Sequence, residues 1–192
     1  MKFNHNTDEK KLIAACLKAD PKAQRQLYEQ FAPGMMAVCF RYTGNYEVAQ
    51  DLLQDGFVKV FAKLDTFKGE GAFGGWVRRV FVSTCLEYLR QKTVLHNSIE
   101  LSELEKAVDD YNADIVGDIT VKELMECVSA LPDNYRTVFN MFAIEGYSHA
   151  EIAEMLEINE NTSRSQFMRA RNLLQKNIAQ ILGEEYVEKY RK

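Results

Sequence analysis

Apolar residues recur three and four positions apart over most of the chain, and this spacing predicts helices rather than strands. The breakers are few, because the only prolines are Pro21, Pro33 and Pro132. Asp20 followed by Pro21 is typical of a helix start, since Asp caps the helix and Pro fits its first turn. We expect helix from there to about Tyr42, with an interruption near Pro33. No segment alternates as a strand would, so the fold class is predicted to be all-α.

The pattern divides into two parts after residue 93. Residues 46–64 and 76–92 have a helical period, and the glycine-rich residues 67–75 between them are expected to form a loop. Residues 94–117 then hold six acidic residues and one lysine. Like-charge repulsion keeps such a segment extended, so we interpret it as an acidic linker. The predicted organisation is therefore a helical domain at 1–93, the linker, and a second helical domain at 118–192.

Residues 147–175 have the pattern of a helix-turn-helix. Ser148 and Glu151 form an S-x-x-E capping box, which predicts a helix start. A short apolar face follows, and INEN at 158–161 supplies a tight break. A second helix is expected from about Asn161. Its apolar side comprises Phe167, Ala170, Leu174, Ile178 and Ile181.

The polar side of this second helix has no acidic residue between Asn161 and Leu182. A solvated helix usually mixes both signs of charge, so this composition favours a phosphate-rich partner. The alternative is an amphipathic helix pair whose cations only aid solubility. In a helix-turn-helix, early residues of the second helix reach base edges and later cations meet phosphates. The candidate DNA contacts are Asn161, Thr162, Ser163, Arg164, Ser165, Gln166, Arg169 and Lys176.

Two long stretches resemble the sigma-70 family of RNA polymerase sigma factors. LPDNYRTVFNMFAIEGYSHAEIAEMLEINENTSRSQFMRAR (131–171) resembles the fourth region of that family, which binds the minus-thirty-five element. YEVAQDLLQDGFVKVFAKLDTFKGEGAFGGWVRRVFVSTCLEYLRQK (46–92) resembles its second region. A short linker with no third domain is similar to the extracytoplasmic-function group. The resemblance implies a factor that binds RNA polymerase core and directs initiation at promoter DNA.

The resemblance implies that the helix at 51–61 grips the clamp coiled coil of the polymerase core. Leu53, Phe57, Val60 and Leu64 would form its inward stripe. An outward face that mixes carboxylates with a valine suits a protein partner, and the alternative is an ordinary solvated face. The candidate core contacts are Asp51, Gln54, Asp55, Val58 and Phe61.

The resemblance also implies that residues 67–90 melt and capture the minus-ten element. Opening DNA requires aromatic surfaces for unstacked bases and cations for the displaced strand. Core packing is the alternative for Phe73 and Trp76, whereas the adjacent arginines at 78 and 79 cannot both be buried cheaply. The candidate minus-ten contacts are Lys68, Phe73, Trp76, Arg78, Arg79, Ser83 and Arg90.

The chain departs from the family pattern at three positions. The family often has Asn where Ser83 stands, Asp where Glu87 stands and Gly where Asn161 stands. Ser83 leaves the base preference at the minus-ten element open. Asn161 is a milder change, because asparagine can still cap a helix.

Composition limits the remaining possibilities. The net charge is −4, so DNA contact must come from local basic patches rather than from the whole chain. The four cysteines lie far apart without a C-x-x-C pair, so we expect reduced, mostly buried thiols and no metal or cofactor. The N-terminal residues are polar and do not resemble a signal peptide. No apolar run approaches the ~18 residues of a membrane span. We therefore expect a cytoplasmic protein without membrane insertion. Many family members are held by an anti-sigma protein, although no residue here identifies one.

Two other functions match parts of the sequence. Gly69, Gly71 and Gly74 fit G-x-G-x-x-G, but a dinucleotide site needs a preceding strand and a βαβ unit, so no catalytic residues are predicted. A helix-turn-helix regulator with an N-terminal helical sensor domain is the alternative to a sigma factor. The aromatic and basic residues of 67–92 favour the sigma factor, because a sensor domain does not need to bind single-stranded DNA.

Overall fold

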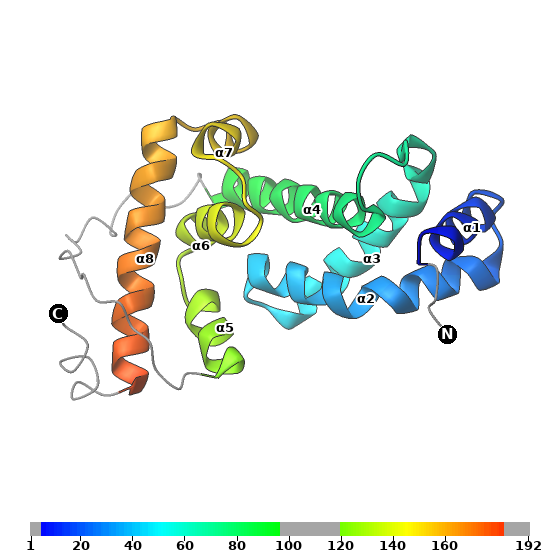
Figure 1. Cartoon of the computed structure of the whole chain (residues 1–192). Helices are drawn as coiled ribbons and strands as arrows, with labels where there is room; N and C mark the ends of the chain where they lie inside the picture. The colour runs from blue at the N-terminus through cyan, green and yellow to red at the C-terminus, as the bar shows by residue number, and fades with distance from the viewer. Residues whose placement is uncertain (1–4, 97–119, 183–192) are drawn as a thin grey trace. The chain divides into compact units, whose positions relative to one another are not determined.

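Helices joined by short turns and loops make up the part of the chain that the structure describes, residues 5–96 and 120–182 (Figure 1). No strand is present in these ranges, which confirms the prediction of an all-α fold. The computed structural model has α1 His5–Leu17, α2 Pro21–Thr43, α3 Tyr46–Ala62, η1 Leu64–Thr66, α4 Phe73–His96, α5 Val121–Ser129, α6 Asp133–Phe139, η2 Asn140–Ile144, α7 His149–Leu156 and α8 Glu160–Leu182. The segment η1 is a 3-10 helix and η2 is a π-helix. Residues 97–119, with most of the predicted acidic linker, lie outside the described residues.

The chain forms two compact units, each with its own core. Unit 1 comprises residues 1–40 and 45–88, and unit 2 comprises residues 41–44 and 89–192. The interior of unit 1 is filled from α2, α3 and α4, where Leu27, Val60 and Phe81 are almost completely buried. In unit 2, α8 packs against α5, α6 and α7. Its core is formed by Cys127, Val128, Leu131, Tyr135, Ala170 and Leu174.

Side-chain caps fix where several helices begin. The Asp20 carboxylate accepts hydrogen bonds from the backbone amides of Lys22 and Ala23, at 2.8 and 3.2 Å, which confirms the predicted start of α2. Ser148 and Glu151 form the predicted capping box at the start of α7. The helix α1 was not anticipated, because its polar sequence has little apolar periodicity.

The expected interruption near Pro33 is wrong, because α2 runs without a break from Pro21 to Thr43. Proline lacks the amide that would bond to the carbonyl four residues earlier. Pro33 and Gly34 both lie on the exposed side of the helix, where water can solvate that carbonyl. Buried Leu27 and Val38, on either side of the proline, anchor both halves in the core of unit 1.

The turn between α7 and α8 contains a residue in an unfavourable backbone conformation. Glu157 follows α7 with φ 57 and ψ 41, in the left-handed region that glycine adopts without steric cost. We expect Glu157→Gly to stabilise unit 2 by about 0.5–1 kcal/mol. The matched control is Glu154→Gly on the exposed side of α7, which should cost about 1 kcal/mol. Amide hydrogen exchange of α7 and α8 measures both, and slower exchange in the control than in Glu157→Gly would contradict the prediction.

Candidate functional site

The outward face of α3 is polar but carries one large apolar side chain. Asp51, Gln54 and Asp55 are exposed, and Val58 is 67% exposed among them. Phe61 is half-buried, with its ring 6.2 Å from that of Phe57. These five residues with Val58 at their centre are here called the α3 face: Asp51, Gln54, Asp55, Val58 and Phe61.

The inward side of α3 differs slightly from the predicted stripe. Phe57 and Val60 are buried, as expected, and Leu64 is buried just beyond the helix in η1. Leu53, however, is only half-buried, whereas its neighbour Leu52 is 4% exposed. The buried stripe is therefore rotated toward Leu52, because α4 crosses α3 closely at Gly56.

An aromatic cluster forms where the loop after η1 meets the start of α4. The ring of Phe73 lies 5.6 Å from Phe31, 5.1 Å from Phe67 and 5.7 Å from Trp76. Phe73 is 1% exposed, so it packs in the core, and this burial argues against the prediction that it contacts DNA. Trp76 and Phe67 are half-buried, and part of each ring remains accessible at the edge of the cluster.

Exposed cations and a small polar network are distributed over the loop after η1 and along α4. Lys68, Arg79 and Arg90 are exposed, and Arg78 is half-buried. On α4 the hydroxyl of Ser83 donates to the Glu87 carboxylate at 3.3 Å, and the Lys59 ammonium from α3 donates to the same carboxylate at 2.6 Å.

The ammonium of Lys59 lowers the pKa of Glu87, chiefly through this hydrogen bond, so the carboxylate stays ionised at neutral pH. The Ser83 hydroxyl therefore faces a fixed negative charge. The two departures from the family pattern on α4 are thus in contact with each other, as their i,i+4 spacing on one helix allows.

The helix-turn-helix of unit 2 consists of α7, the turn at Glu157 and α8. The predicted start of α8 near Asn161 is one residue late, since the helix begins at Glu160. The cap is provided by Asn159, whose side-chain oxygen accepts from the Asn161 amide at 2.8 Å. Asn161 therefore lies in the first turn rather than at the cap.

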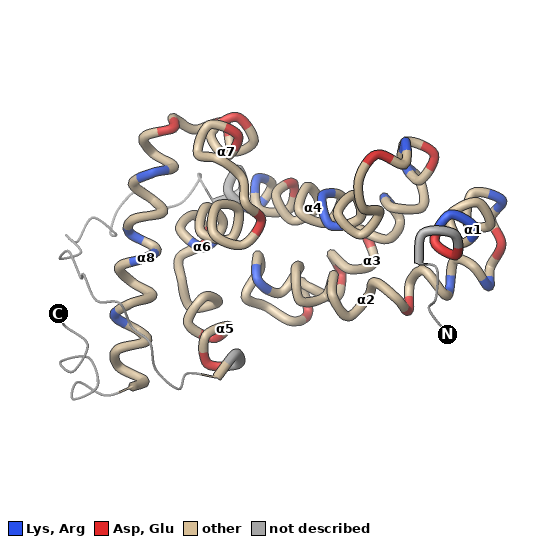
Figure 2. The backbone as a smooth tube through the Cα atoms, viewed as in Figure 1, with Lys and Arg blue, Asp and Glu red and all other residues tan. Residues whose placement is uncertain are grey.

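Most of the predicted DNA contacts on α8 are accessible. Asn161, Arg164, Ser165, Arg169 and Lys176 are exposed. Thr162 and Gln166 are half-buried. Figure 2 shows basic positions along α8 and no acidic one after its first turn.

Two of the α8 arginines have partners within unit 2. Arg164 forms an ion pair with Glu160 one turn earlier, with both side chains about half exposed at 59% and 45%. Arg169 donates to the Tyr135 hydroxyl at 3.3 Å. The Glu160 carboxylate lies directly beside the predicted reading residues, and sequence reasoning had not assigned it a role.

Ser163 differs from its neighbours because it is 0% exposed. Its hydroxyl forms a hydrogen bond of 2.9 Å with Nδ1 of His149 on α7. The burial of Ser163 therefore argues against the prediction that it contacts DNA. The sequence held a signal for this, since Ser163, Phe167, Ala170 and Leu174 are spaced as one stripe of the helix.

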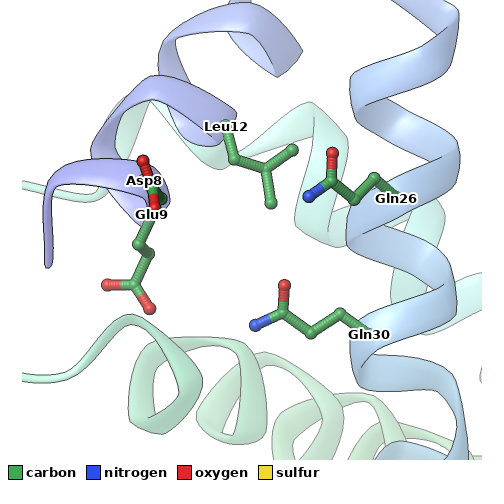
Figure 3. A pocket seen from close by; sticks show the side chains of 5 residues that line it. All are labelled: Asp8, Glu9, Leu12, Gln26 and Gln30. Atoms are coloured by element: carbon green, nitrogen blue, oxygen red, sulfur yellow. The ribbon is translucent and has the colours of Figure 1, made fainter. Parts of the chain in front are cut away.

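One pocket of about 370 Å³ lies in unit 1 between α1 and α2 (Figure 3). It is lined by Asp8, Glu9, Leu12, Gln26 and Gln30, and none of these was a predicted site residue. The carboxylates make it unsuited to a nucleic-acid phosphate. All four cysteines are buried. No group of three or more His, Cys, Asp or Glu side chains in the described residues could hold a metal ion.

None of the helices within the described ranges is long and apolar enough to span a membrane.

Comparison with protein families gives a match for each half of the chain. Residues 27–94 match Sigma-70 region 2, and residues 122–174 match Sigma-70, region 4. The first match argues against the alternative of an N-terminal sensor domain. It also covers α3 and α4, which carry the exposed candidate contacts of unit 1.

Curated relatives match over nearly their whole length. The chain is 23% identical over 181 residues to an ECF RNA polymerase sigma-E factor of Haemophilus influenzae, covering 89% of this chain and 95% of that protein. It is 24% identical over 186 residues to an RNA polymerase sigma-H factor of Pseudomonas aeruginosa, covering 92% and 96%.

A solved structure has a related fold. A sigma factor from Bartonella quintana, crystallised with an anti-sigma factor, aligns with a TM-score of 0.50 and 19% identity. The alignment covers 80% of this chain and 95% of that one.

Proposed function

Since the chain belongs to the extracytoplasmic-function group of the sigma-70 family, we propose that it binds RNA polymerase core and directs transcription initiation at specific promoters. The observation that carries this proposal is the exposed side of α8, which has no acidic residue after Glu160 in its first turn and lies behind a capped α7. This is the arrangement by which a helix-turn-helix enters the major groove. The role requires no catalytic residue and no cofactor.

The division of labour follows the two matched regions. Unit 1 binds the polymerase core through the α3 face and engages the minus-ten element through Trp76 and the candidate cations Lys68, Arg78 and Arg79. Unit 2 reads the minus-thirty-five element through the first turns of α8. The domain limits that we propose are 1–93 and 118–192, with the acidic linker between them. The two family matches end and begin close to these limits, at residues 94 and 122.

The direct test is reconstitution with RNA polymerase core. The full chain should co-elute with core and start transcription from promoters at which core alone does not initiate. The promoters can be selected from a pool with randomised minus-ten and minus-thirty-five elements. A chain that binds DNA but never associates with core would contradict the proposal and support a conventional regulator.

The α3 face provides a sharper test of polymerase binding. We expect Val58→Asp to weaken binding to core at least tenfold, because a charge replaces an exposed apolar contact at the centre of the face. Gln54→Lys should also weaken binding to core, because its positive charge offsets the negative charges of Asp51 and Asp55 on the same face. Titration of labelled chain with core measures both affinities.

The control for the α3 face is Glu29→Lys, an exposed charge reversal on α2 outside that face. It should leave the affinity for core unchanged. Thermal unfolding of all three variants separates a lost contact from a lost fold. Normal core affinity for both Val58→Asp and Gln54→Lys would remove the α3 face from the proposal.

We also propose a cytoplasmic location and control by an anti-sigma protein. The Bartonella quintana sigma factor of related fold was crystallised with such a protein. Co-purification of the tagged chain from its own host, followed by a transcription assay with the captured protein, tests this. A captured protein that does not inhibit transcription would contradict the proposed control.

A further inference from the structure

His149 joins the two helices of the helix-turn-helix through its side chain. It occupies the first position of α7 and is 9% exposed. Its Nδ1 is 2.9 Å from the hydroxyl of Ser163, which is completely buried on α8. One ring face stacks on Phe142 of η2 at 4.2 Å and 12°, and Phe167 of α8 packs at 5.9 Å and 63°. The ring is therefore held by three elements, and it in turn fixes the start of α8.

The geometry of α8 connects this contact to the reading residues. Ser163 points inward between Thr162 and Arg164, which are the predicted contacts to base edges. Each residue of a helix is rotated by about 100° from the previous one. A polar anchor at Ser163 therefore sets the rotation of the first turns of α8, and with it the direction of Arg164.

We propose that His149 is a positioning residue for promoter recognition, which aims Arg164 at the base edges of duplex DNA by holding Ser163. This inference rests on the proposed reading of the minus-thirty-five element by α8. It assigns a specificity role to a side chain that does not itself reach DNA. The hydroxyl of Ser163 is the partner of His149 in this contact.

The surroundings favour the neutral form of the ring. Burial lowers the pKa of His149, and the nearby Arg164 guanidinium lowers it further, while Glu160 opposes the shift. Phe142 on the η2 side is uncharged, and the Glu151 carboxylate of α7 is occupied at the helix cap by Ser148.

Both ring nitrogens of a protonated histidine are donors, so Nδ1 could still bond to the Ser163 hydroxyl, but protonation would place a buried cation beside Arg164. Because the unfolded chain binds this proton more readily than the folded chain, the free energy of unfolding decreases as the pH falls below about 6.5. The stabilisation from the neutral ring is present above that pH and is lost as the pH falls through the lower pKa of the folded state.

The test compares isosteres of the two ring nitrogens in the complex with polymerase core. Asparagine places a polar atom near the position of Nδ1, whereas glutamine places one near Nε2. We expect His149→Gln and Ser163→Ala to reduce discrimination between a selected promoter duplex and a scrambled duplex by roughly tenfold. His149→Asn should retain most of it. Affinity for the scrambled duplex should change little in all three variants.

A second measurement does not depend on DNA. Proton–carbon NMR of the full chain follows the His149 ring, whose signal is identified by its loss in His149→Asn. The ring should titrate below the usual histidine range. Arg164→Ala should raise its pKa and Glu160→Gln should lower it, because the first change removes a repelling charge and the second an attracting one.

The outcomes separate the inference from the function on which it rests. If the wild type discriminates between duplexes but His149→Gln and Ser163→Ala, both folded by circular dichroism, discriminate equally well, His149 only packs and the inference fails. Equal losses on both duplexes would have the same meaning. If the wild type shows no discrimination, the proposed function of α8 fails as well. Should His149→Gln not fold, Ser163→Ala and the NMR titration still decide the question.

Discussion

Replacing Gly56 by alanine is expected to destabilise unit 1 by about 2 kcal/mol, after allowing for the better helix propensity of alanine. A Cβ atom at Gly56 would lie 2.2 Å from Cε1 of Phe81 and 2.6 Å from two further atoms of that ring. The ring cannot easily move aside, because Phe81 is completely buried and packs edge-on against Phe57 at 5.2 Å. The two helices would have to separate at their closest point.

Urea unfolding followed by tryptophan fluorescence measures this effect in unit 1 alone. Trp76 is the one tryptophan in the chain and lies in unit 1. The control is Gly34→Ala in α2, where no atom lies within 4 Å of the added Cβ. It should stabilise unit 1 by about 1 kcal/mol.

The double variant Gly56→Ala with Phe81→Leu should lose less stability than the two single changes added together, because leucine leaves room for the methyl group. A Gly56→Ala protein as stable as wild type would show that α3 and α4 leave room for a methyl group at Gly56. The crossing matters for the proposed function, since α3 carries the α3 face and α4 carries cations that we propose to contact the minus-ten element. A protein that loses it should also lose its affinity for core.

The parts of the fold that sequence predicted were those determined by local chemistry. Asp20 with Pro21 and the capping box of Ser148 and Glu151 specify helix starts with their own side chains, so their positions could be read directly. The helix-turn-helix followed from one such cap and one apolar stripe. The continuity of α2 through Pro33 could not be predicted, because it depends on burial of residues on both sides of the proline.

The site was predicted less well, because accessibility depends on partners that are distant in sequence. Phe73 is buried by Phe31 and Phe67, and Ser163 is buried by His149. Extending the buried stripes backward by one turn would have corrected both residues. Phe73 precedes buried Val77 and Phe81 at intervals of four, as Ser163 precedes Phe167. The i,i+4 spacing of Ser83 and Glu87 on a helix allows their contact, but no pattern in the sequence indicates that Lys59 of α3 binds the same carboxylate.

Replacing Arg164 by alanine is expected to cost about 1–3 kcal/mol in binding to the selected promoter duplex and much less on a scrambled duplex. Arg164 is exposed in the second turn of α8, where a helix-turn-helix contacts base edges. In the structure its guanidinium is paired with Glu160, so DNA must compete with that carboxylate. The measurement is the dissociation constant of the complex with core for each duplex over a salt series.

Two control variants separate base reading from charge in this prediction. Lys176→Ala lies on the exposed side of α8 three turns later. It should weaken binding to both duplexes about equally and reduce the slope of log affinity against log salt concentration by about one, as loss of a phosphate contact does.

Alanine at Arg164 also leaves the Glu160 carboxylate unpaired beside DNA, where it repels the phosphates of any sequence. The double variant Glu160→Gln with Arg164→Ala removes this repulsion. If the double variant still discriminates less between the two duplexes than the wild type, the loss is due to the missing base contact. Equal losses on both duplexes for Arg164→Ala and for the double variant would identify Arg164 as a phosphate contact and leave Thr162 and Gln166 as the reading residues.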